Sequence, residues 1–281
     1  MTLSVIIPTF NEKRYIVGCL NSLLAQSLKP KEIIIVDDGS SDKTLNVLSG
    51  LRITNYELRI LSQKHKGAGA ARNLGASKAT GNILVFVDAD MDFDPNFLRS
   101  LVDPIIHRRA KGTFSKDEYV KNWSNPWAKA WNYCRGLKEH RAIPSSYPNT
   151  APVFRAILKK EFIKVGGFDE KRGYDDDWSL SEKLGVKAVN APNAVYYHHN
   201  PDSLTAIFIQ ARWQGSRKFK FGTIGKIFHL IRSLLGLGFF LSPLWVAVRF
   251  RHPPSFLAKI IFEIGFDTGI IRAAISGRTS K

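Results

Sequence analysis

Apolar runs and helical spacing alternate along the first ninety residues of the chain. Four runs have the length and composition of buried strands, at residues 3–8, 32–39, from 58–61 on, and at 82–90. Helices are expected between them, at residues 15–24, around 45–48 and at 67–79. Ser40 or Ser41 is expected to cap the second of these helices. Apolar strands that alternate with helices predict an α/β fold, in which a mainly parallel sheet is covered by helices on both faces.

Tryptophans set residues 111–150 apart from this alternation. Trp123, Trp127 and Trp131 are spaced four residues apart, and Pro126 marks the expected start of a helix. We expect this stripe to pack on the sheet, and contact with a ligand or with lipid is the alternative. The α/β pattern then returns and includes a helix that ends at Gly185.

The last part of the chain is more apolar and more basic than the rest. Between Arg232 and Arg249 lie 16 residues without a charge, interrupted by Pro243. This length is at the short edge of what can span a bilayer. A following helix carries Lys259, Glu263 and Asp267 at four-residue spacing and is expected to be amphipathic and interfacial. We therefore expect the C-terminal segment to associate with a membrane, and the alternative is ordinary helices packed on the rest of the protein.

Charge and cysteine content narrow the choice of partner and compartment. Residues 203–281 contain 12 Lys and Arg against two acids, whereas the preceding residues have a net charge of only +7. Such a bias indicates a polyanionic partner, either nucleic acid or anionic lipid. The two cysteines show no spacing typical of a disulfide framework or zinc site, and no secretory signal is evident, so we expect a reducing compartment.

Two carboxylates stand at the end of the fourth predicted strand. Asp88 and Asp90 are separated by one residue, so their side chains point to the same side. Asp38 stands at the end of the second strand, and ligands of such sheets bind beyond the carboxyl ends of the strands. Because like charges repel, a cation is the usual reason to keep such a pair together, and oxygen ligands suit Mg²⁺ or Mn²⁺.

Five motifs occur in an order that resembles the family 2 glycosyltransferases, which have the GT-A fold. They are SVIIPTFNE (4–12), EIIIVDDGSSDKT (32–44), GAGAARNLGASKATGNILVFVDADM (67–91), VGGFDE (165–170) and YDDDWSLSEKLG (174–185). The similarity covers roughly residues 3 to 215, and the ordered set is far more specific than any single motif.

The resemblance implies a site for a nucleotide sugar and a metal ion. The residues implied for the nucleotide sugar are Thr9, Asn11, Glu12, Asp38, Gly67, Gly69, Arg72, Asn73 and Asp88. Asp90 would bind Mn²⁺ or Mg²⁺ directly, with Asp88 beside it. His198 or His199 would complete the metal shell, and the position three before Pro201 favours His198.

The resemblance also implies a catalytic base in the acidic stretch before the helix that ends at Gly185. Aligned on the residues that follow, the family's acidic pair is Asp176 and Asp177, and the second acid removes the acceptor proton. Asp175 is a weaker candidate. Neighbouring carboxylates raise the proton affinity of at least one of them. Capping of the helix by these acids is the alternative reading.

The implied activity is metal-dependent, inverting transfer of a sugar from a UDP- or GDP-sugar to a hydroxyl of a lipid-linked or glycan acceptor. Residues 1–110 would form the nucleotide-sugar half of the catalytic domain, 111–222 the acceptor and base half, and 223–281 the membrane-associated segment. The protein would act at the cytoplasmic face of the membrane, in polysaccharide or glycolipid synthesis. A nucleotidyltransferase that makes sugar nucleotides is the alternative, and a nucleic-acid-binding protein is a more distant one.

Overall fold

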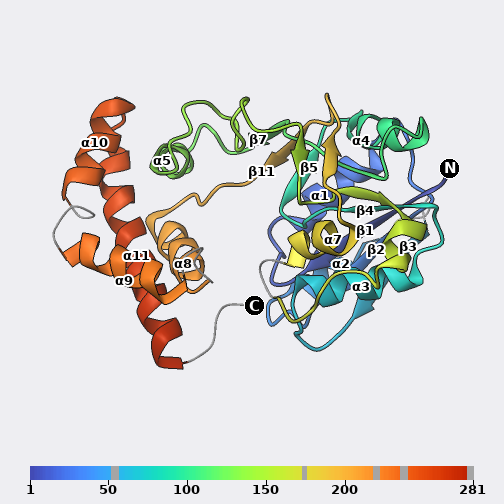
Figure 1. Cartoon of the computed structure of the whole chain (residues 1–281), viewed down its shortest axis with the longest axis horizontal. Helices are drawn as coiled ribbons and strands as arrows, with labels where there is room; N and C mark the ends of the chain where they lie inside the picture. Colours follow the sequence, from blue (N-terminus) through green and yellow to red (C-terminus); the bar gives the residue numbers. More distant parts are fainter. Residues whose placement is uncertain (52–56, 173–175, 218–221, 235–239, 277–281) are drawn as a thin grey trace. The chain divides into compact units, whose positions relative to one another are not determined.

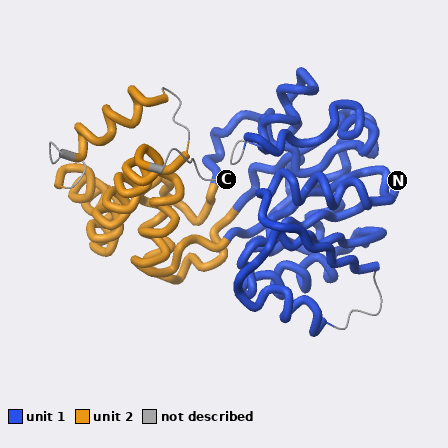
Figure 2. The backbone as a smooth tube through the Cα atoms, turned by 90° about the horizontal axis from the view of Figure 1, so that it is seen from below, with its two compact units in different colours: residues 1–118, 143–198, 281 blue, residues 119–142, 199–280 orange. Residues whose placement is uncertain are grey.

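A computed structural model of the chain describes residues 1–51, 57–172, 176–217, 222–234 and 240–276. The described chain forms two compact units, shown in blue and orange in Figure 2. Of the described residues, those in 1–118 and 143–198 form unit 1, and those in 119–142 and 199–276 form unit 2. The division into residues 1–110, 111–222 and 223–281 that the sequence suggested stays a prediction.

Unit 1 is built on an eight-stranded mixed sheet with the order β3-β2-β1-β4-β9-β6-β10-β8 (Figure 1). Its strands are β1 (Leu3–Thr9), β2 (Glu32–Asp37), β3 (Glu57–Ser62), β4 (Ile83–Phe86), β6 (Gly112–Phe114), β8 (Thr150–Ala151), β9 (Ala156–Leu158) and β10 (Ala188–Asn190). The first four strands are parallel, as the sequence predicts. Strand β9 is inserted between β4 and β6 and is antiparallel to both. A second sheet has the order β5 (Met91–Phe93), β11 (Tyr196–His198) and β7 (Glu118–Val120).

Alternation of side chains along β1 gives the sheet two apolar faces. Val5 and Ile7 belong to a core with helices α1 (Ile16–Leu24), α2 (Thr44–Ser49) and α4 (Phe97–Ile106). Ile6 belongs to the opposite core, with α3 (Ala68–Lys78), α6 (Lys159–Lys164) and α7 (Asp176–Leu184). Helices thus cover both faces, as the continuous apolar strands predict.

Most helices begin and end close to the residues predicted from capping residues, prolines and glycines in the sequence. Helix α5 (Pro126–Cys134) starts at Pro126, and the Asn125 side chain accepts hydrogen bonds from the next two free backbone N–H groups. Gly185 follows α7 in the left-handed conformation, with φ of 67°. The cap of α2 was predicted wrongly: its N-terminal Thr44 N–H donates to Asp42, 2.9 Å away, and not to Ser40 or Ser41.

Unit 2 is helical and contains α5, α8 (Leu204–Gly215), α9 (Gly222–Leu234), α10 (Ser242–Arg249) and α11 (Pro254–Ser276). Its core contains Trp131, packed with Ile207 of α8 and Ala258 of α11. The expectation that the tryptophan stripe packs on the sheet is therefore wrong for Trp127 and Trp131, whose apolar partners include residues of α8 and α11. Trp123 packs instead in a separate cluster with Val120 of β7 and Ala128 and Ala142. No described helix is both long and apolar enough to cross a membrane, and residues 235–239 of the uncharged stretch lie outside the described chain.

Candidate active site

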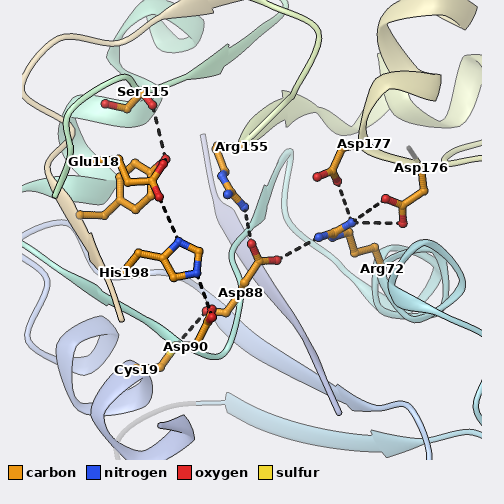
Figure 3. A network of polar contacts seen from close by, with 11 residues as sticks. Cys19, Arg72, Asp88, Asp90, Ser115, Glu118, Arg155, Asp176, Asp177 and His198 are labelled. Carbon is orange, nitrogen blue, oxygen red and sulfur yellow. Dashed lines mark hydrogen bonds and ion pairs between the residues drawn. The ribbon is translucent and has the colours of Figure 1, made fainter. Parts of the chain in front are cut away.

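Asp88, which follows β4, lies between two arginines (Figure 3). Arg72 of α3 donates to its Oδ1 and Arg155, next to β9, donates to its Oδ2, each at 2.9 Å. Both guanidinium groups are largely buried, and a charge-assisted hydrogen bond is strong where water is scarce. Burial alone would raise the pKa of Asp88, but the charges of Arg155 and Arg72 outweigh it and hold this pKa well below the usual range. Asp88 is therefore a permanent anion.

Arg72 also binds the acidic pair at the start of α7. Its Nη1 lies 2.6 Å from Oδ1 of Asp177 and 3.2 Å from Oδ2 of Asp176. Burial would lower the pKa of Arg72, but the charges of Asp177, Asp88 and Asp176 raise it. One buried cation therefore joins two acidic motifs that are far apart in the sequence.

Gly69 allows this junction to form. A Cβ atom at Gly69 would lie 2.6 Å from Oδ2 of Asp176, which is closer than real Cβ contacts. Asp176 is buried, and burial together with the charge of Asp177 raises its pKa although Arg72 opposes the shift. The neighbouring carboxylate of Asp177 thus contributes to the raised pKa of Asp176, as the sequence led us to expect, but burial is the larger cause. Asp177 is the more accessible of the two, with 30% of its side chain exposed against 5% for Asp176.

Asp90 begins a second chain of polar contacts. Its Oδ2 lies 2.8 Å from Nε2 of His198, and Nδ1 of the same ring lies 2.9 Å from Oε1 of Glu118. The hydroxyl of Tyr196 donates to the other oxygen of Glu118, at 2.9 Å. Burial lowers the pKa of His198, but Asp90 and then Glu118 raise it well above its ordinary value. Of the two adjacent histidines, the structure thus brings His198 to Asp90.

Glu12 adds a third acid to the surroundings of Asp88 and Asp90. Burial, followed by the charges of Asp90 and Asp88, raises the pKa of Glu12 to about 8. Glu12 is therefore the acid of this group whose charge is least favoured, mainly because it is buried. The described residues contain no group of three or more His, Cys, Asp and Glu side chains arranged as a metal site. Asp90 and His198 nevertheless offer an oxygen and a nitrogen donor, and Mg²⁺ or Mn²⁺ commonly takes its other ligands from water and a substrate phosphate.

The predicted nucleotide residues at the ends of β1 and β2 organise the loops around them. Asp38 is buried, and its carboxylate accepts hydrogen bonds from Gln63 Nε2 (2.6 Å) and from the N–H groups of Lys66 (2.9 Å) and Gly67 (2.8 Å). The side-chain oxygen of Asn11 accepts from the N–H groups of Ser41 and Asp42, at 2.8 and 3.1 Å.

Thr9, in contrast, has an unused polar atom. Its hydroxyl oxygen is buried and has no hydrogen-bond partner among the described residues. A buried hydroxyl without a partner is costly, and a bound ligand is one way to satisfy it.

The start of α3 contains the remaining predicted residues. Gly67 precedes the helix with φ of 100°, a conformation that favours glycine, and the first turn contains no acid. Asn73 points away from this end: its side chain donates to the carbonyl of Phe168 and to Glu170, both at 3.0 Å, and accepts from the N–H of Phe168 at 2.9 Å. Asn73 therefore fixes the loop that precedes α7.

Two residues of this network were not predicted from the sequence. Arg155 is a lone cation in an otherwise apolar segment, and Glu118 is one charged residue among several. The one sequence feature that could have drawn attention to Arg155 is its charge within a short apolar segment. Asp175, the weaker candidate for the base, lies outside the described residues.

Comparison with known proteins gives one family. Residues 4–166 match the family described as Glycosyl transferase family 2. Glycosyltransferase GlyG of Streptococcus pneumoniae is 27% identical over 192 residues, which are 63% of this chain and 63% of that protein. The poly-beta-1,6-N-acetyl-D-glucosamine synthase of Staphylococcus aureus is 24% identical over 220 residues, 75% of this chain and 53% of the synthase. The alignments thus span less than two thirds of these curated relatives.

Solved structures have the same fold. TarS 1–349 of S. aureus, crystallised in complex with UDP-GlcNAc, superposes with a TM-score of 0.55 at 18% identity, covering 99% of this chain and 93% of TarS 1–349. The mannosyltransferase PcManGT of Pyrobaculum calidifontis, in complex with GDP-Man and Mn²⁺, gives a TM-score of 0.54 at 21% identity, covering 98% and 76%.

Proposed function

The chain belongs to glycosyl transferase family 2, and on that premise we propose that it moves a sugar from a UDP- or GDP-sugar to a hydroxyl group of a lipid-linked or glycan acceptor. The transfer is a single displacement with inversion. The acceptor oxygen forms a bond to the anomeric carbon, the bond from that carbon to the diphosphate oxygen breaks, and Asp177 receives the acceptor proton.

One observation carries this proposal: Arg72 contacts Asp88 and Asp177 at the same time. The first acid belongs to the motif expected beside the donor, and the second is the expected base. A glycosyl transfer needs these groups near one another, because the donor and the acceptor meet at one carbon atom. A role of Asp177 in helix capping alone would not require its carboxylate to bind a buried arginine of α3.

The leaving nucleoside diphosphate has cationic and backbone partners in unit 1. Arg72 and Arg155 place two guanidinium groups beside Asp88, and Arg72 also binds Asp177 and Asp176. The N-terminus of α3 presents free N–H groups and no acid in its first turn, and such ends favour phosphate. The unsatisfied hydroxyl of Thr9 is available to the nucleoside.

A divalent ion fits the part of the site that contains Asp90 and His198. Asp90 and His198 would hold it, and Glu118 orients the imidazole ring through its second nitrogen. Such an ion supplies positive charge that offsets the charge growing on the departing diphosphate. The raised pKa of Glu12, caused first by burial and then by the charges of Asp90 and Asp88, is consistent with this assignment, because a cation at Asp90 would offset part of that negative charge.

Asp177 suits the role of the base in both position and access. Its Oδ1 is held by Arg72, and nearly a third of its side chain is exposed and reachable by an acceptor. Asp176 is buried against Arg72 and Gly69 and has a raised pKa, so it positions the arginine and does not meet the acceptor.

A screen of nucleotide sugars by thermal unfolding tests the donor assignment. Specific binding raises the melting temperature by mass action. We expect UDP- or GDP-sugars to stabilise the chain in the presence of Mn²⁺, and Asp90→Asn to abolish the Mn²⁺-dependent part. Asp103→Asn, an exposed acid on α4, is the matched control. Stabilisation by a nucleoside triphosphate with release of pyrophosphate would instead establish a nucleotidyltransferase.

A further inference from the structure

Helices α9, α10 and α11 of unit 2, which are labelled in Figure 1, expose large apolar side chains. On α9 these side chains recur every three or four residues, so they form a stripe along one side of the helix. On α10 and α11 they follow a similar helical spacing. The residues are Ile224, Ile227, Phe228 and Ile231 on α9, Leu244, Trp245 and Val248 on α10, and Phe256, Leu257, Ile264, Ile271 and Ile275 on α11. Phe228 and Val248 are 71% and 68% exposed, which is far more than a packed core allows.

The charged row of α11 points away from solvent. Glu263 is fully buried and binds Arg232 of α9 at 2.7 Å and Lys259 of its own helix at 2.9 Å. Asp267 lies 3.3 Å from His229 of α9. The sequence suggested an amphipathic, interfacial helix, and α11 places Glu263 and Asp267 between helices and leaves apolar side chains exposed.

The exposed charges that remain on these helices are all basic. Glu263 and Asp267 are the only acids after Ser203, and both are engaged inside unit 2. Arg249, Arg251 and Arg272 are exposed. The guanidinium of Arg249 lies 4.7 Å from the ring centre of Trp245. A tryptophan beside an arginine is typical of the boundary between lipid headgroups and acyl chains.

The positive charge beside the exposed apolar side chains of α9, α10 and α11 indicates which partner covers them. Leu244, Val248, Arg251, Pro253 and Phe256 line an open hollow of about 630 Å³ at the junction of α10 and α11, together with Ala247. A second copy of the chain would bring its own arginines to this face, with no exposed acid on the described part of these helices to pair with them. Anionic lipid offers apolar chains and negative phosphates at the same boundary.

We propose that the exposed faces of α9, α10 and α11 bind the surface of an anionic lipid bilayer. The apolar side chains enter the boundary of the acyl region, and Arg249, Arg251 and Arg272 contact lipid phosphates. The helices lie on the membrane and do not cross it, which agrees with the absence of a spanning helix among the described residues. This inference is independent of the chemistry proposed for unit 1.

Flotation of the full chain with lipid vesicles tests the proposal. Vesicles of phosphatidylcholine alone are compared with vesicles that contain about one third phosphatidylglycerol. We expect flotation with the anionic vesicles only. The triple variant Phe228→Ser, Trp245→Ser, Val248→Ser should weaken it about tenfold or more, and Arg249→Glu with Arg251→Glu should weaken it by a similar factor. Ile163→Ser removes an equally exposed apolar side chain, 62% exposed on α6 of unit 1, and should leave flotation unchanged.

Two further measurements make the result decisive. Thermal unfolding and stabilisation by the nucleotide sugar should match the wild type in every variant, which separates loss of lipid binding from misfolding and from failure of the proposed transfer. Light scattering reports self-association. Equal flotation of the triple variant and the wild type would overturn the proposal. So would a wild-type chain that ignores anionic vesicles and forms dimers that the triple substitution dissociates.

Discussion

Arg72 and Asp177 are 105 residues apart in the chain, yet Nη1 of the arginine lies 2.6 Å from Oδ1 of the aspartate. The same guanidinium binds Asp88 through its other terminal nitrogen. The donor side and the acceptor side of the proposed reaction therefore share one buried cation. In the proposed reaction, a diphosphate that binds Arg72 would compete with both carboxylates for this cation, and donor binding would thereby be coupled to the state of the base.

Replacement of Arg72 should damage both stability and transfer. Arg72→Ala leaves three acids without their buried partner, and loss of one member of a buried ion pair typically costs about 3–5 kcal/mol. Arg72→Lys retains the charge but not the planar fork, so it should recover part of the stability and little of the transfer rate. Chemical denaturation and initial rates measure the two effects. Arg172→Lys, in a more exposed pair with Glu182, is the control and should change neither by much.

A methyl group at Gly69 should act on the base without removing any charge. Gly69→Ala places Cβ against Oδ2 of Asp176, so this carboxylate and the arginine that it holds must shift. We expect transfer to fall by about tenfold or more, because small displacements of reacting groups are costly. At Gly50→Ala the nearest atom is 3.5 Å from the new Cβ, so this control should leave the rate intact. A fully active Gly69→Ala enzyme would show that the position of Asp176 does not matter.

The charge state of Glu12 should make stability depend on pH. Its pKa is about 8 in the folded chain, raised by burial and by Asp90 and Asp88, and 4.5 in the reference state. The folded chain therefore holds a proton that the unfolded chain has lost between these values, and stability decreases as pH rises through this window. Glu12→Gln resembles the protonated form. It should raise the melting temperature of the ligand-free protein more at pH 9 than at pH 6, and an equal change at both pH values would argue against the assignment.

If Asp90 and His198 hold the metal ion, substitution of His198 should lower the affinity for Mn²⁺. His198→Gln removes a nitrogen donor, and Glu118→Gln weakens the group that orients it, so each should reduce Mn²⁺ affinity by about 10–100-fold. Titration calorimetry in the presence of nucleoside diphosphate measures this loss. The neighbouring His199→Gln should bind Mn²⁺ as the wild type does. If His199→Gln had the larger effect, the metal would lie elsewhere.

The parts of the structure that follow from short-range patterns were predictable from the sequence. Strands β1, β2 and β4 and helices α1, α3, α5 and α7 have apolar spacing and end signals of their own, such as Asn125 before Pro126 and Gly185 after α7. The position of β9 was not predictable, because a three-residue strand carries too little pattern to choose its partners. Long-range packing decides that it lies between β4 and β6.

Single site residues could likewise be predicted where they belong to a local sequence motif, and not where long-range packing determines their partners. Asp88, Asp90 and Asp177 belong to ordered motifs and could be named in advance, whereas Arg155 and Glu118 belong to none. Their importance depends on which groups the fold brings to them. The sequence also could not predict that the charges on α11 point into unit 2. A periodic row of charged residues is compatible with contact either to water or to a partner such as Arg232.

The most direct test of the account is the rate of sugar transfer by Asp177→Asn, measured with donor binding on the same preparation. The substitution keeps the size of the side chain but removes its capacity to accept the acceptor proton, so binding of the nucleotide sugar should persist while transfer falls by about 10²–10⁴-fold. Glu182→Gln on the same helix should transfer at the wild-type rate. Wild-type transfer by Asp177→Asn would contradict the proposed role of this residue and the mechanism built on it.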